Sequence, residues 1–115
     1  MTARPRTRLD RVRASAGIAQ LALQQIEDEL GADDLDLLEL AAILRELQED
    51  AETPGGLFPA LAQLVSTAAR TAEHLEPDHD GDASCPLHEA AALLDDAGQR
   101  LTWAARALTR DGEPQ

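Results

Sequence analysis

The segment PLHEAAALLDDAGQRLTWAARALTR, residues 86–110, carries the most regular apolar pattern in the chain. Its apolar residues and one glycine follow one another at spacings of three and four: Leu87, Ala91, Leu94, Gly98, Leu101, Ala105 and Leu108. This spacing places them on one face of an α-helix, and Pro86 is well tolerated in a first helical turn. The segment therefore predicts a long helix with a continuous apolar seam that packs against other helices.

Three earlier segments repeat this periodicity and predict helices at residues 8–30, 33–52 and 56–75. Thr7 is expected to cap the first helix, and Asp33 with Asp36 to cap the second. β-Branched and aromatic residues are too few for a sheet. We therefore expect an all-α fold, an antiparallel up-down four-helix bundle over residues 8–110. A flexible basic arm is expected at residues 1–7 and a tail at residues 111–115.

The three earlier helices are each expected to bury a defined stripe, which in the second helix is Leu37, Leu40, Leu44, Leu47 and Ala51. In the first helix the stripe is Leu9, Val12, Ala16, Ala19, Leu23, Ile26 and Leu30; in the third it is Leu57, Leu61, Leu64, Ala68, Ala72 and Leu75. Gly17 and Gly98 fall inside helices, where each costs about 1 kcal/mol relative to alanine. We expect close approach of neighbouring helices to offset that cost.

Composition narrows the classes of function. The chain has 115 residues, which suits one domain, and a formal net charge of −12, which disfavours binding to nucleic acid or to anionic membranes. The single cysteine cannot form an intrachain disulfide, and no stretch approaches the roughly 20 apolar residues of a membrane span. A cytoplasmic protein is the expectation.

Two groups of residues are candidates for partner binding. Ile18 and Leu21 lie near the side of the first helix opposite its main stripe, so that helix is apolar on two sides. Trp103, the only tryptophan, falls outside the seam of the fourth helix with Arg100 and Arg106 nearby. Exposed aromatic residues beside arginine are typical of interface anchors. The main hypothesis is a non-catalytic protein that binds another protein or a second copy of itself.

The acidic residues suggest a different kind of binding. Residues 27–52 contain eleven acids and one arginine. Most of these acids lie off the apolar stripe of the second helix, where a solvated surface is the ordinary explanation. The alternative is a protein that mimics DNA or, like an antitoxin, neutralises a basic partner.

The loop at residues 74–89 suggests a metal site as a further alternative. It contains His74, His79, Cys85 and His88, whose nitrogen and sulfur atoms are zinc ligands, although their spacing is not that of a zinc finger. A structural junction that ends one helix and starts the next explains the same residues. Cys85 beside these histidines is also the most plausible activated thiol.

The same loop resembles a calcium site in the spacing of its acids. Asp78, Asp80, Asp82 and Glu89 occupy positions 1, 3, 5 and 12 of an EF-hand-like loop, but Ala83 stands where the sharp turn requires glycine. No glycine-rich phosphate loop and no specific nucleophile–base pattern is present, so no catalytic residue is predicted. No cofactor is predicted beyond the alternative of zinc or calcium in this loop.

Overall fold

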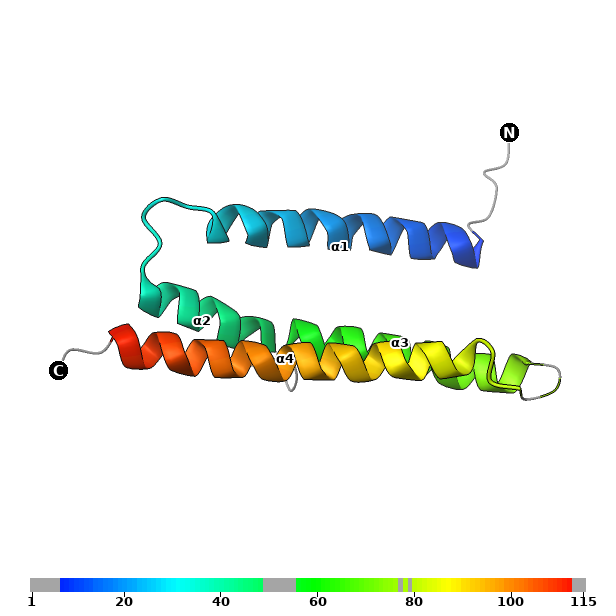
Figure 1. Ribbon diagram of the computed structural model, residues 1–115. Helices are drawn as coiled ribbons and strands as arrows, with labels where there is room; N and C mark the ends of the chain where they lie inside the picture. Colours follow the sequence, from blue (N-terminus) through cyan, green and yellow to red (C-terminus); the bar gives the residue numbers. More distant parts are fainter. Residues whose placement is uncertain (1–6, 49–55, 77, 79, 113–115) are drawn as a thin grey trace, which may run out of the picture. The chain divides into compact units, whose positions relative to one another are not determined.

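The computed structural model describes residues 7–48, 56–76, 78 and 80–112, and these contain four helices and no strand (Figure 1). The helices are α1 (Arg8–Leu30), α2 (Leu37–Gln48), α3 (Leu57–Leu75) and α4 (Ser84–Gly112). The predicted all-α helical bundle is confirmed. Residues 1–6 of the predicted arm and residues 113–115 of the predicted tail lie outside the described residues. None of the described helices combines the length and apolar character needed to cross a lipid bilayer.

The chain divides into two units, residues 1–35 and residues 36–115, and α1 is the helix of the first. Its start is fixed by a capping box: the Thr7 hydroxyl accepts from the Asp10 backbone N–H at 3.0 Å, and the Asp10 carboxylate accepts from the Thr7 N–H at 3.2 Å. At the other end the Gly31 N–H donates to the Glu27 carbonyl at 3.0 Å. The helix therefore begins and ends where the sequence predicts.

Within the first unit no residue of α1 is buried, so the burial of its stripe stays a prediction from the sequence. Leu9, Val12 and Leu23 of that stripe are exposed. The helix has 23 residues, which exceeds the length of about 12–15 below which isolated helices are marginal, and its N-terminal N–H groups are capped. Its length and its N-terminal cap therefore favour the helix locally.

In the second unit, α2 and α3 follow one another along α4 (Figure 1). Arg45 of α2 contacts Thr109 in the C-terminal part of α4, and Glu73 of α3 contacts His88 near its start. Both helices therefore run antiparallel to α4. The α2 helix has 12 residues and the α3 helix has 19, and their combined length is close to that of α4, which has 29 residues. One long helix therefore provides the packing surface for both.

The core of this unit is built from alanine. Its buried apolar residues are Ala41, Ala62, Ala69, Ala91 and Ala105. The predicted seam of α4 is confirmed, because all seven of its residues are buried or half-buried. Gly98 is one of them, and a Cβ added there would overlap the carboxamide of Gln48 from α2. The predicted close helix approach is therefore present at Gly98; Gly17 lies in the first unit, where an added Cβ meets nothing within 4 Å.

Two expectations about α2 and α3 need correction. The α2 helix begins at Leu37, and its cap is Asp36, whose Oδ1 accepts from the Glu39 N–H at 2.8 Å; Asp33 lies in the preceding turn. In α3, Leu64 of the predicted stripe is 65% exposed, and Ala62 and Ala69 are buried in its place. Small side chains allow a closer approach to α4, and Phe58, Leu61 and Val65 are half-buried on the same helix.

Candidate partner-binding surface and the α3–α4 loop

Trp103 lies on the surface of α4 with 52% of its area exposed. The guanidinium carbon of Arg100 lies over the indole, 5.9 Å from the ring centroid, which is cation–π geometry. The Arg100 Nε also donates to the Asp96 carboxylate at 3.2 Å, one helical turn away. This ion pair and the ring together hold Arg100 in place on one side of Trp103.

Trp103 also borders an open pocket of about 530 Å³. The lining residues are Arg45, Trp103, Arg106, Thr109 and Arg110, and we refer to them as the arginine–tryptophan pocket. The Arg45 Nη2 donates to the Thr109 hydroxyl at 2.7 Å, and that hydroxyl donates to the Ala105 carbonyl at 2.8 Å. Arg45 is thereby oriented from α2 across α4.

The pocket combines predicted and unpredicted residues. Trp103 and Arg106 were candidates from the sequence, and spacings of three and four residues place Arg110 on the same side of α4. Arg45 belongs to another helix, so only the register between α2 and α4 reveals it. The predicted Arg100 contacts the Trp103 ring but does not line the pocket.

Charge is distributed unevenly around this pocket. Residues 36–115 contain sixteen acids and five arginines, and four of the five arginines line the pocket or lie over Trp103. Arg45, Arg106 and Arg110 are exposed, and none of them forms an ion pair with an acid of the described residues. The pocket is therefore a cationic surface on a strongly acidic unit.

The other predicted contact residues, Ile18 and Leu21, lie on α1 in the first unit. Their exposed fractions are 70% and 69%. They are three residues apart and so lie on the same side of the helix. Each presents a large apolar side chain on the surface of α1.

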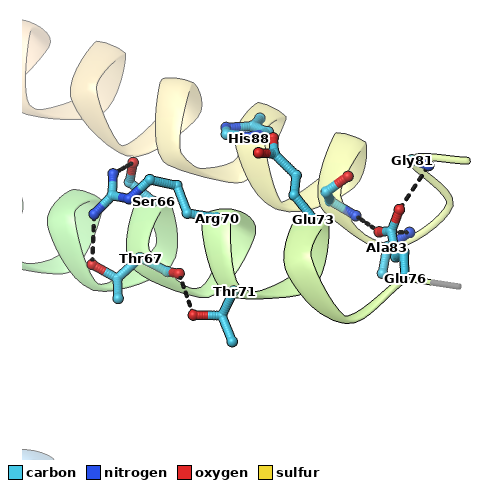
Figure 2. A network of polar contacts seen from close by, with 10 residues as sticks. Ser66, Thr67, Arg70, Thr71, Glu73, Glu76, Gly81, Ala83 and His88 are labelled. Carbon is cyan, nitrogen blue, oxygen red and sulfur yellow. Dashed lines mark hydrogen bonds and ion pairs between the residues drawn. The ribbon is translucent and has the colours of Figure 1, made fainter. Parts of the chain in front are cut away.

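The loop between α3 and α4 is organised by Glu76, which directly follows α3 (Figure 2). Its carboxylate accepts from the backbone N–H groups of Gly81 at 2.7 Å, Ala83 at 3.1 Å and Ser84 at 2.6 Å. Partial burial alone raises the pKa of the Glu76 carboxyl, but these hydrogen bonds outweigh it and leave the pKa below its usual value. Glu76 thus satisfies donors at the start of α4, which begins at Ser84, two residues earlier than predicted.

The structure separates the predicted zinc ligands. His74 is exposed on α3, Cys85 is exposed at the second position of α4, and the His88 Nε2 contacts the Glu73 carboxylate (Figure 2). His79 lies outside the described residues. Among the residues that are described, no group of three or more histidine, cysteine, aspartate or glutamate side chains is arranged to hold a metal ion.

The predicted calcium ligands take part in local contacts of the loop. The Asp80 Oδ1 accepts from the Asp82 N–H at 3.0 Å, and Gly81 adopts the left-handed conformation with φ of 81°. A pocket of about 400 Å³ lies here, lined by Glu73, Glu76, Asp80, Gly81, Ser84 and Cys85. Asp78 and Glu89 are exposed and do not line it.

Comparison of the chain with protein-family models, with curated proteins and with solved structures finds no match.

Proposed function

We propose that this protein is a non-catalytic helical-bundle protein that binds a protein partner through the arginine–tryptophan pocket. The observation that carries the proposal is the half-exposed Trp103 with arginines beside it, at a junction of two helices. Tryptophan and arginine are enriched among the residues that dominate binding energy at protein interfaces. A monomeric protein gains nothing in stability from exposing an indole to water, since burying such a ring is favourable.

An affinity purification with matched baits tests this proposal. Wild-type protein, Trp103→Ala and Leu93→Ala are used as baits at low salt in extracts of the native host. Leu93 is an exposed apolar residue of the same helix, so it controls for nonspecific hydrophobic capture. We expect a partner that binds wild-type protein and Leu93→Ala but not Trp103→Ala. Equal recovery by all three baits would contradict the proposal.

A second copy of the chain is the other form of partner that the sequence suggests. Light scattering coupled to size exclusion distinguishes it, because self-association through the pocket would raise the mass of wild-type protein but not that of Trp103→Ala. Metal binding by the loop and mimicry of DNA remain predictions from the sequence.

A further inference from the structure

We infer that the partner presents an acidic segment with an apolar side chain, and that this segment lies in the arginine–tryptophan pocket. The inference rests on the proposed function and specifies the chemistry of the partner. It follows from three properties of the pocket: its charge, its apolar surface and its continuation along the groove between α2 and α4.

The charge of the pocket selects for carboxylates. Arg45, Arg106 and Arg110 bring three guanidinium groups to one surface, and the described residues provide no carboxylate as an ion-pair partner for them. Guanidinium groups bind carboxylates through two parallel hydrogen bonds, which fixes the orientation of both groups. Arg100 is already paired with Asp96, so it supports the ring of Trp103 and contributes less free charge.

The apolar part of the pocket selects for a large apolar side chain of the partner. Its surface is formed by the indole of Trp103 and by the aliphatic stems of the arginines, which pack well against apolar groups. A volume of about 530 Å³ falls in the range of pockets that enclose a small ligand, so it also has room for a large apolar side chain. An anchor of this kind beside acidic neighbours matches the pocket in both respects.

The groove continues beyond this pocket. A second hollow of about 180 Å³ is lined by Arg45, Gln48, Thr102 and Arg106, and it shares Arg45 and Arg106 with the first. The Gln48 Oε1 itself is buried against Gly98 and has no hydrogen-bond partner among the described residues. A segment that passes from one hollow to the next can contact Arg45 and Arg106 from both, which favours an extended or helical peptide over a single small anion.

Nucleic acid is the less favourable polyanion for this surface. A phosphate backbone needs a track of cations over several phosphates, whereas the arginines here are confined to one end of α4. The adjoining turn of α4 presents Asp95 and Asp96, both exposed, which would repel a longer polyanion. A short acidic peptide can avoid these carboxylates.

Selection from a displayed library of random peptides tests the inference on the full-length protein. We expect the selected peptides to be enriched in aspartate and glutamate around one large apolar residue. Binding of selected peptides that lack tryptophan is then measured by the fluorescence of Trp103, the only tryptophan of the chain, so that the signal reports on the pocket itself. Their affinity should fall as salt is raised.

Matched arginine variants provide the control. Arg106→Gln/Arg110→Gln should weaken binding about tenfold or more, the loss expected for a charge-assisted hydrogen bond. Arg70→Gln should leave affinity unchanged, because Arg70 lies on α3 and bonds to Ser66 and Thr67 (Figure 2). Selected peptides without acidic enrichment, equal affinity of the double variant, or tighter binding of a single-stranded oligonucleotide than of any peptide would overturn the inference.

The outcomes separate this inference from the proposed function. Peptides that bind the arginine variants as tightly as the wild-type protein would overturn this inference. They would leave a protein-binding role for another surface, such as that of Ile18 and Leu21. Failure of Trp103→Ala to affect capture of any partner would remove the proposed function itself.

Discussion

Glu76 shows how one side chain can join two helices. Glu76 directly follows α3, and its carboxylate accepts from the backbone N–H groups of Gly81 and Ala83 in the loop and of Ser84, the first residue of α4. A helix start leaves four N–H groups without partners inside the helix, and an anion there is favoured by the helix dipole. One residue therefore determines both the path of the loop and the first residue of α4.

Replacement of Glu76 by glutamine should lower the melting temperature near neutral pH, because an amide accepts these hydrogen bonds more weakly than a carboxylate. The folded-state pKa of Glu76 is lowered, so its stabilising contribution is present above the unfolded-state value of about 4.3 and is lost as pH falls through the folded-state pKa. The difference between wild-type protein and Glu76→Gln should therefore shrink in acid. Thermal melts across this pH range measure it.

Glu89→Gln is the matched control, since Glu89 is an exposed acid near the same end of α4. An equal effect of both substitutions, or a difference for Glu76→Gln that grows in acid, would contradict the role of Glu76.

Gly98 and Gln48 form a second pair whose effects depend on each other. A Cβ at position 98 would overlap the Gln48 carboxamide, whose Oε1 is buried and unpaired among the described residues. Gly98→Ala should stabilise the protein by about 1 kcal/mol in a Gln48→Ala background, because the helix gains alanine propensity without a clash. In the wild-type background the gain should be smaller or reversed, since the carboxamide must adopt another rotamer.

Urea unfolding followed by Trp103 fluorescence measures this double-mutant cycle, and we expect a coupling of about 1 kcal/mol. Additive effects of the two substitutions would show that position 98 does not require glycine for helix approach.

At the scale of the helices, the sequence predicted the elements better than their faces. The boundaries of α1 and the seam of α4 follow from Thr7, Gly31 and the spacing of Leu87 to Leu108, because caps and periodicity are local properties. The stripe of α3 was wrong at Leu64, Ala68 and Leu75, which are exposed, whereas Ala62 and Ala69 are buried. The size of the side chains alone cannot reveal which face of α3 packs against α4.

The candidate site shows the same limit. Trp103, Arg100 and Arg106 share one side of a single helix, so the spacing of α4 was sufficient to group them. Arg45 bonds to Thr109, which lies 64 positions later in the sequence. Glu76 bonds to residues up to eight positions later. Their roles depend on how α2, α3 and the loop pack against α4, which periodicity does not specify.

The loop between α3 and α4 should keep its structure without a metal. Its backbone donors at Gly81, Ala83 and Ser84 are bonded to Glu76, and the described residues bring no three metal-binding side chains together. Purified protein without an affinity tag should therefore melt at the same temperature with and without a chelator. Bound zinc or calcium in elemental analysis, together with a lower melting temperature in chelator, would instead support the metal-site hypothesis.

Across the whole molecule, charge is concentrated in one part of the sequence. The chain carries a net charge of −12, and residues 36–115 hold sixteen of its twenty-two acids with only five arginines. Four of those arginines line or border the arginine–tryptophan pocket, so the rest of that unit has little positive charge to balance its acids. Folding brings these like charges closer together, which opposes the compact state.

Salt should therefore stabilise the protein. Screening extends over a distance of about 10 Å at 0.1 M salt, so sodium chloride weakens repulsion among exposed carboxylates. We expect the melting temperature followed by Trp103 fluorescence to rise by about 4 °C or more between low and high salt, which corresponds to about 1 kcal/mol. The increase should vanish in acid, where the carboxylates are protonated and the repulsion is removed. A melting temperature that falls with salt at neutral pH would instead show that attractive ion pairs outweigh repulsion in the folded protein.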